Sequence, residues 1–201
     1  MEKLDLATVP GEAATVLRFW FGDERETAYP RFRDEWFQKR GEFDTAIREH
    51  FMTIHQRGSW GELEHWRTTL LGALAYVILF DQFSRNMFRD SAAAFAFDTM
   101  ALAAAHSAVA SGFDAHLAPA MRMFFYLPFE HSENLVDQER SVILFQRLAE
   151  EEPGLTDVLE YAKRHHDVIM RFGRFPHRNR LLGRLSTPEE AAFLRQSGSS
   201  F

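Results

Sequence analysis

The 201-residue sequence contains no cysteine. That absence excludes disulfide scaffolds, cysteine-ligated zinc sites, iron–sulfur clusters and catalysis by a thiol. A long hydrophobic run is also missing, because the longest uncharged apolar stretch covers only residues 70–80, whereas a membrane-spanning helix needs about 20 residues. We therefore expect the protein to have no membrane partner.

An excess of positive charge is missing as well. The chain has 23 Lys+Arg against 29 Asp+Glu, which gives a net charge of −6. A general nucleic-acid-binding protein needs a basic surface that displaces counterions, so we expect no nucleic-acid partner. One stretch departs from the average, since residues 163–184 hold a cluster of basic side chains and a single acid, Asp167. Such a stretch in an acidic protein meets either buried carboxylates or an anionic ligand.

The first residues lack the features of a secretory signal. Glu2 and Asp5 stand where a signal peptide carries bases, and no apolar segment follows them. We therefore expect a soluble, cytoplasmic protein. Its length suits one domain, which we place over residues 1–201, with a frayed tail at 197–201.

The alternation of apolar and polar residues that is typical of strands is also absent, and apolar residues recur at helical spacing instead. We expect Gly58, Gly112 and Gly173 to end helices and Pro128 to stop one. Gly41 either splits a long helix or marks a close helix crossing. The fold class is all-α, with about eight antiparallel helices joined by short loops. The predicted helices cover residues 12–21, 32–56, 60–88, 91–111, 117–127, 132–152, 155–172 and 187–196. Ser132 or Asn134 can cap the helix over 132–152, and Thr187 and Glu190 form a capping box at the start of the last helix.

The first cluster of polar residues follows the most apolar helix. Asp81, Arg85 and Arg89 are four residues apart and share a helical face, with Asn86 beside them. One interpretation is a carboxylate, an amide and two guanidiniums that bind a ligand together. The other is a polar helix end whose charges pair with neighbouring helices.

A second cluster combines two carboxylates with an imidazole at a predicted helix N-terminus. Glu130 and Glu133 flank His131. A carboxylate that orients His131 makes this histidine a candidate general base or ligand-binding group, and Glu130 and Glu133 are catalytic candidates with it. The alternative is that Ser132 or Glu133 caps the helix and His131 is solvated.

Two further clusters lie in the basic stretch. The predicted helix over 155–172 has an apolar stripe, and His165 and His166 occupy the next position of that stripe. We therefore expect one or both histidines to face the core. His166 is a candidate ligand-binding residue. After Gly173, an ordered loop presents Arg174, Arg178 and Asn179, and the planar guanidiniums of the two arginines suit a carboxylate or a phosphate. The alternative for this loop is that its arginines bridge protein carboxylates.

Three of these segments, together with residues 16–22, resemble the signatures of a bacterial family known as domain of unknown function 924. The matching segments are 81–89, 125–133 and 171–179, the last continuing through Gly183 and Arg184 to Glu190. The resemblance covers about residues 13–195. It implies a tetratricopeptide-like, right-handed array of helical hairpins and implies no activity.

Three functions fit these residues. The first is a helical scaffold that binds a small anionic ligand or a peptide terminus through arginine and histidine side chains. The second is a hydrolase or lyase that uses the same pocket on a phosphorylated or carboxylated small molecule, with His131 as base. The third is a buried ion-pair network that fixes helix register and has no ligand. Because Glu62 and His65 supply only half of a di-iron carboxylate motif and phosphate-binding loops are missing, we expect no metal and no cofactor.

Overall fold

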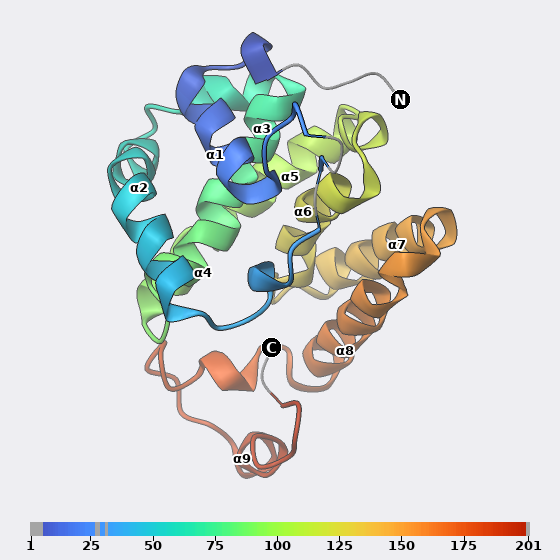
Figure 1. Cartoon of the computed structure of the whole chain (residues 1–201). Coiled ribbons are helices and arrows are strands. Elements are labelled where there is room, and N and C mark those ends of the chain that lie inside the picture. The colour runs from blue at the N-terminus through green and yellow to red at the C-terminus, as the bar shows by residue number, and fades with distance from the viewer. Residues whose placement is uncertain (1–5, 27–28, 31, 200–201) are drawn as a thin grey trace. The chain divides into compact units, whose positions relative to one another are not determined.

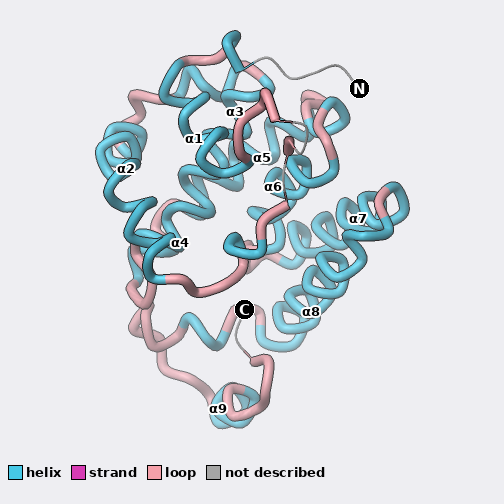
Figure 2. The backbone as a smooth tube through the Cα atoms, in the orientation of Figure 1, coloured by secondary structure: helices cyan, strands magenta, loops and turns pink. Residues whose placement is uncertain are grey.

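The computed structural model describes residues 6–26, 29–30 and 32–199. Every regular element within those residues is helical (Figure 2), so the all-α prediction is confirmed. The chain groups into two compact units, each of which is described by itself. Unit 1 comprises residues 1–89 and 93–128, and unit 2 comprises residues 90–92 and 129–201. The single-domain interpretation and the tetratricopeptide-like arrangement stay predictions.

Unit 1 contains the helices from α1 to α5 and most of α6 (Figure 1). Within it α3 packs against α1 and α5, and α2 packs against α4. The segment from Leu71 to Ser84 is buried throughout, as its uninterrupted apolar character predicts. The bounds are α1 Gly11–Phe21, α2 Gly41–Ser59, α3 Leu70–Val77, α4 Phe83–Met87, α5 Asp98–Ala110 and α6 Pro119–Glu130.

The predicted helix over 60–88 is broken into several pieces. A 3-10 segment, η3 (Glu64–Thr68), is followed by Thr69, whose hydroxyl accepts a hydrogen bond from the Gly72 N–H and caps α3. A π-helical turn, η4 (Ile78–Gln82), then separates α3 from α4. The 3.6-residue period alone does not reveal these changes, because an apolar run is buried on every side whatever its helical type.

Helix α2 begins at Gly41, so this glycine splits the predicted helix over 32–56, and the short 3-10 turn η2 (Asp34–Trp36) precedes it. The prediction that Gly58 ends the helix is wrong, because α2 continues through it to Ser59. A Cβ atom at Gly58 would lie 2.6 Å from the Phe80 ring. The glycine is therefore required by a close helix contact and not by a helix end.

Two further boundaries differ from the sequence predictions. The helix expected over 91–111 is divided into η5 (Ala92–Phe95) and α5. The prediction that Pro128 stops the preceding helix is wrong, because α6 runs through it to Glu130. Proline removes one backbone hydrogen bond, and the complete burial of Phe129 in the same last turn offsets that loss.

Unit 2 is built on α7 (Leu135–Glu151) and α8 (Thr156–Phe172), which pack side by side (Figure 1). The Asn134 side chain caps α7, and Gly173 ends α8 in the left-handed conformation at φ 66°. Both caps follow the sequence predictions. The last helix, α9 (Pro188–Phe193), starts at the predicted capping box but ends before the expected Gln196.

One described stretch, Ala92–Ala110, is long and apolar enough to cross a membrane by length and composition. It is two helical pieces, η5 and α5, and α5 packs against α3. The stretch also contains Asp98, whose carboxylate accepts hydrogen bonds from Arg85. A single stretch of this kind is weak evidence for a membrane span.

Candidate functional site

The first polar cluster lies in unit 1 and is paired with acids of the same unit. Asp81 is completely buried, and its Oδ1 lies 3.3 Å from Nη1 of Arg85. The same guanidinium donates to both carboxylate oxygens of Asp98, at 2.9 and 3.2 Å. Arg85 is therefore held between two carboxylates, one from its own helical face, as predicted, and one from α5.

Asp44 on α2 is the second acid that anchors this cluster. It accepts from Nε and Nη2 of Arg89 at 2.7 and 2.8 Å, and from the Asn86 amide at 2.8 Å. Burial raises the pKa of Asp44, but the hydrogen bonds from Arg89 and Asn86 outweigh it, so the pKa is lowered overall. Arg89 lies beyond the end of α4, and its bidentate partner is Asp44.

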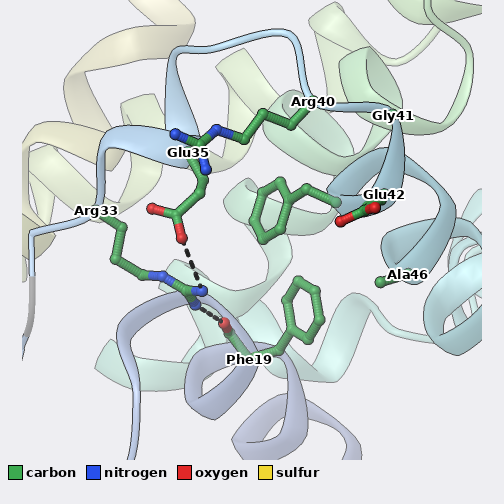
Figure 3. A pocket seen from close by; sticks show the side chains of 8 residues that line it. Phe19, Arg33, Glu35, Arg40, Gly41, Glu42 and Ala46 are labelled. Carbon is green, nitrogen blue, oxygen red and sulfur yellow. Dashed lines mark hydrogen bonds and ion pairs between the residues drawn. The ribbon is translucent and has the colours of Figure 1, made fainter.

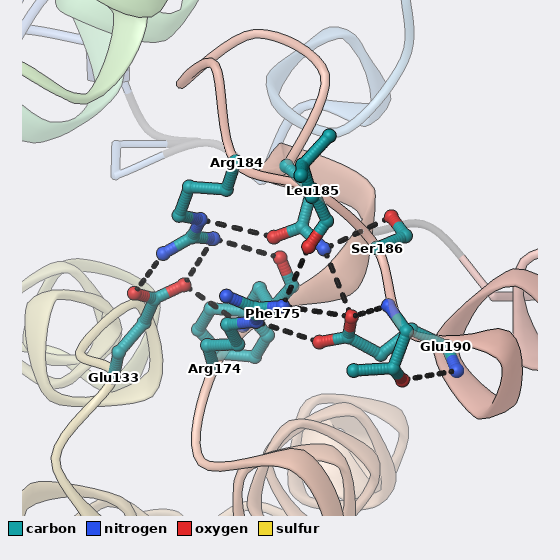
Figure 4. A network of polar contacts seen from close by, with 9 residues as sticks. Glu133, Arg174, Phe175, Arg184, Leu185, Ser186 and Glu190 are labelled. Carbon is teal, nitrogen blue, oxygen red and sulfur yellow. Dashed lines mark hydrogen bonds and ion pairs between the residues drawn. The ribbon is translucent and has the colours of Figure 1, made fainter.

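The loop between α8 and α9, residues 173–187, carries Arg174, Arg178 and Arg184 and is called the arginine loop below. Glu133 ties it to the start of α7 (Figure 4). Arg184 donates to Oε2 and Oε1 of Glu133 at 2.7 and 2.9 Å, and Oε1 also accepts from the backbone N–H of Phe175 at 2.8 Å. Arg184 further donates to Oδ1 of Asn179 at 2.9 Å. Burial raises the pKa of Glu133, whereas Arg184 and the Phe175 N–H lower it, and the lowering prevails.

A second bidentate pair joins the same loop to α9. Arg174 donates to Oε1 and Oε2 of Glu190 at 2.6 and 2.8 Å and to the Leu185 carbonyl at 2.9 Å. Glu190 is 2% exposed and also accepts from the Thr187 N–H and from the Asn179 amide. The hydrogen bonds from Arg174 lower the pKa of Glu190 to about 2.

The buried histidine His165 meets a carboxylate within unit 2. Its Nδ1 lies 3.2 Å from Oε1 of Glu130 and 2.9 Å from the Tyr161 carbonyl. Burial holds the pKa of His165 well below the usual histidine range. The His131 ring lies 6.3 Å from the His165 ring, and His166 is half-buried with its Nδ1 3.5 Å from Asp167.

Arg178 belongs to the same part of unit 2 and is 6% exposed. Its guanidinium carbon stands 4.5 Å from the centre of the buried Phe175 ring. Phe175 also packs against Val168 and Ile169. Phe175 is completely buried and therefore anchors the loop after Gly173 against the core of unit 2.

These contacts limit what the clusters do chemically. Glu133 has both oxygens engaged by Arg184 and the Phe175 N–H, so it is held ionised and is a weak proton acceptor. His165 is neutral and 4% exposed, which shields it from a substrate. Among the described residues, no group of three or more His, Cys, Asp or Glu side chains is arranged to hold a metal ion.

Unit 1 contains a further buried polar pair that the sequence analysis did not single out. Nε2 of His55 lies 2.8 Å from Oγ of Ser84, and both side chains are at most 1% exposed. The His55 ring packs against Phe80, Phe88 and Phe97. Burial lowers the pKa of His55 to about 4, so the imidazole is neutral at physiological pH.

An open cavity of about 630 Å³ lies at the start of α2, within unit 1 (Figure 3). Two aromatic rings face it, Phe19 and Phe43, stacked with centroids 5.5 Å apart and planes inclined by 18°. Arg33, Glu35 and Arg40 stand on one side in Figure 3, and Glu42 and Ala46 stand on the other. None of these residues was predicted as a site residue, although Phe19 lies in the family-like segment over residues 16–22.

Inside the cavity the two arginines are held differently. Nη1 of Arg33 donates to the Phe19 carbonyl at 2.8 Å, while Nη2 lies 3.6 Å from Oε1 of Glu35. Its guanidinium carbon is 5.6 Å from the Phe43 ring centre. Arg40 is exposed and donates from Nε and Nη2 to the side-chain oxygen of Gln38, at 3.2 and 2.9 Å.

The structure thus divides the predicted site residues between the units. Asp81, Arg85, Asn86 and Arg89 belong to unit 1, and the remaining candidates belong to unit 2. Within unit 2, segments 130–133, 165–166 and 174–190 are joined by the contacts above. The idea that all four clusters line one hollow stays a prediction.

Several partners were missed for an identifiable reason. The sequence pattern places Asp44 and Asp98 on the polar faces of their helices, where acids are usually solvated. No local pattern shows that these two acids pair with arginines. Glu190 was identified only as part of a capping box, although the same carboxylate pairs with Arg174. The Arg33 and Arg40 side chains fall in an irregular segment with no periodicity to interpret.

Comparison with known proteins identifies relatives of unknown function. A family model described as a bacterial protein of unknown function (DUF924) matches residues 16–198. A solved structure of a protein of unknown function, ATU0120 from Agrobacterium tumefaciens, is 36% identical and superposes with a TM-score of 0.81. The match covers 95% of this chain and 99% of the other. Among curated proteins, none matches the sequence.

Proposed function

This chain belongs to the bacterial family of unknown function DUF924, and from the geometry of this member we propose that it is a helical binding protein for a small carboxylate-bearing molecule. The ligand occupies the cavity at the start of α2. The arginine–carboxylate networks of the signature segments hold the helices and loops in register. The protein works in the cytoplasm.

The observation that carries this proposal is the combination of cavity, rings and guanidiniums within unit 1. A volume of about 630 Å³ falls within the range of small-molecule sites, which are roughly 300–1,000 Å³. The partly exposed Phe19 and Phe43 rings offer an apolar face for the body of a ligand. Arg33 and Arg40 beside them offer planar donors for a carboxylate.

The arginines of the signature segments already have protein partners, which supports the proposal that they hold the fold in register and do not bind the ligand. Arg85, Arg89, Arg174 and Arg184 each donate to both oxygens of a protein carboxylate. An anionic ligand at any of these guanidiniums competes with a bidentate partner that is already in place. Arg40 has the neutral Gln38 amide as its partner, so a ligand carboxylate displaces a weaker acceptor there.

Calorimetric titration with 3-phenylpropionate tests the proposal. This probe has one carboxylate and one planar apolar group. We expect saturable binding that the Arg33→Gln/Arg40→Gln double variant weakens by at least about tenfold, since a hydrogen bond to a charged group contributes about 1.5–3 kcal/mol. The exposed Arg140 on α7 provides the control, and Arg140→Gln should bind like the parent.

Two results would overturn this assignment. One is the absence of any binding of 3-phenylpropionate at millimolar concentration. The other is binding that the double variant leaves unchanged. Thermal unfolding of each variant without ligand checks that unit 1 remains folded. Fractionation of cells that express the full chain tests the cytoplasmic location, and recovery in the periplasm or the membranes contradicts it.

A further inference from the structure

We propose that the ligand of this cavity is a free amino acid with an aromatic side chain, recognised through its paired ammonium and carboxylate groups. The inference rests on the proposed function, because it names the ligand class of the same cavity. It goes further in assigning a role to Glu35, an acid that a site built only for an anion would not contain.

The first support is the spacing of opposite charges on one side of the cavity. Nη2 of Arg33 and Oε1 of Glu35 lie 3.6 Å apart, which is too far for a hydrogen bond. The two groups thus form an ion pair without a direct hydrogen bond, and both line the cavity. The ammonium and carboxylate of an α-amino acid are joined through a single carbon atom, so they present opposite charges at a similar separation.

The second support is the charge balance of the lining. Two guanidiniums, Arg33 and Arg40, are matched by two carboxylates, Glu35 and Glu42. A lining with separated charges of both signs binds a zwitterion more strongly than a simple anion, because the zwitterion meets both the guanidiniums and a carboxylate. The pKa of Glu35 is lowered by its own backbone N–H and by the nearby arginines, so this carboxylate is ionised when it meets an ammonium group.

The third support is the apolar side of the cavity. Phe19 and Phe43 are stacked on each other and are only partly covered. A third aromatic ring placed against such a pair gains edge or offset contacts at centroid distances of about 4.5–7 Å. The guanidinium of Arg33 is already fixed over the Phe43 ring and bonded to the Phe19 carbonyl. One residue thus links the charged side of the cavity to the aromatic side.

A free amino acid fits this arrangement better than a peptide does. In a peptide the ammonium and the carboxylate are at opposite ends of the chain, and the atom next to the ammonium-bearing carbon is an amide carbonyl. Such a group does not place a full negative charge beside Arg33 and Arg40. The observations therefore favour the amino acid, and a dipeptide becomes a comparison in the test.

The test compares four probes by calorimetric titration of the full-length protein. L-phenylalanine carries all three groups, 3-phenylpropionate lacks the ammonium, phenethylamine lacks the carboxylate, and L-alanine lacks the ring. We expect L-phenylalanine to bind at least about tenfold more tightly than each of the others, because each removes one charge-assisted or aromatic contact. L-phenylalanyl-L-alanine should bind more weakly than L-phenylalanine.

The decisive variant is Glu35→Gln. It should weaken L-phenylalanine binding by about tenfold or more, because the ammonium contact is lost. Binding of 3-phenylpropionate should be unchanged or tighter, because the variant removes a negative charge 3.6 Å from Arg33. Glu139 is an exposed acid on α7, and Glu139→Gln should bind both probes like the parent. Since Glu35 is partly exposed, the substitution should not unfold the protein, which thermal unfolding verifies.

The outcomes separate this inference from the function on which it rests. If 3-phenylpropionate binds as tightly as L-phenylalanine and Glu35→Gln affects neither, the amino acid assignment is wrong while the carboxylate-binding function stands. Tighter binding of the dipeptide also contradicts the assignment. If none of the probes binds, both the inference and the proposed function are wrong.

Discussion

Arg184 and Glu133, 51 residues apart in the chain, form a bidentate ion pair that ties the arginine loop to the start of α7. The pair is not isolated, because Glu133 also accepts from the Phe175 backbone and Arg184 also donates to the Phe175 carbonyl at 3.1 Å. Both charged groups thus fix the same turn after α8. These side-chain contacts hold the loop together with its short 3-10 turn, η8 (Pro176–Arg178).

Removal of this pair should destabilise unit 2. We expect Arg184→Met to lower the free energy of unfolding by about 2–4 kcal/mol, since it leaves Glu133 partly buried without its main partner. Urea unfolding followed by circular dichroism measures the change. Arg171→Met is the control, because the Arg171–Glu189 pair is largely exposed and such pairs contribute about 0–1 kcal/mol. Equal losses in the two variants would contradict the anchoring role.

Glu190 should make the stability of the protein depend on pH in the acid range. Its pKa is lowered to about 2 by Arg174, so on acidification the unfolded chain takes up this proton before the folded chain does. The stabilising contribution is complete above the ordinary glutamate value of 4.5 and is lost as the pH falls toward about 2. Urea unfolding at several pH values should show a shallower decline for Glu190→Gln. The exposed neighbour Glu189 gives the control, and Glu189→Gln should keep the parent slope.

His55 should add a second pH dependence at milder acidity. Burial lowers its pKa from 6.5 to about 4, so between these values the unfolded state binds the proton more readily than the folded state. Stability is therefore fully present above pH 6.5 and declines as the pH falls toward 4. We expect His55→Gln, which retains a hydrogen-bonding group near Ser84, to reduce this decline. His50 on the same helix is exposed, and a His50→Gln variant that flattened the profile equally would rule out the buried imidazole as the cause.

Gly58 should tolerate no side chain. A Cβ atom there would lie 2.6 Å from the Phe80 ring and 2.9 Å from Leu63, so Gly58→Ala should lower the free energy of unfolding by about 1–3 kcal/mol through overpacking. Gly41 at the start of the same helix has nothing within 4 Å of the equivalent position. Gly41→Ala should therefore be neutral or slightly stabilising in the same urea unfolding experiment. A neutral Gly58→Ala would show that the contact with Phe80 is loose.

Helical class and most helix ends could be predicted from the sequence because they depend on local chemistry. Thr187 and Glu190 form the expected capping box, and Gly173 adopts the left-handed conformation at the end of α8. The failures at Gly58 and Pro128 have the opposite cause. There a contact with a distant side chain, or the burial of the next residue, outweighs the local preference.

The candidate site was less predictable because ion pairs join residues far apart in the sequence. Arg85 and Arg89 were identified in one cluster and Arg174 in another. Whether each of them meets a ligand or an acid depends on Asp98, Asp44 and Glu190. The spacing of charged residues along one helix predicts which of them share a face. It does not predict which residues of other helices they contact. Arg33 and Glu35 were missed because their importance depends on a cavity, which is a property of the folded chain.

The π-helical turn η4 (Ile78–Gln82) has a consequence for how this chain can vary in length. The Phe83 N–H reaches back five residues to the Ile78 carbonyl, so the turn accommodates one residue more than an α-helix does. Removal of one of these residues would leave an ordinary α-helical turn with nearly the same total rotation, because the π-helical turn spreads one residue more over that rotation. Arg85 and Asn86 would then still point toward the acids that now receive them. The chain can therefore lose one residue at this place without changing which charges meet farther along.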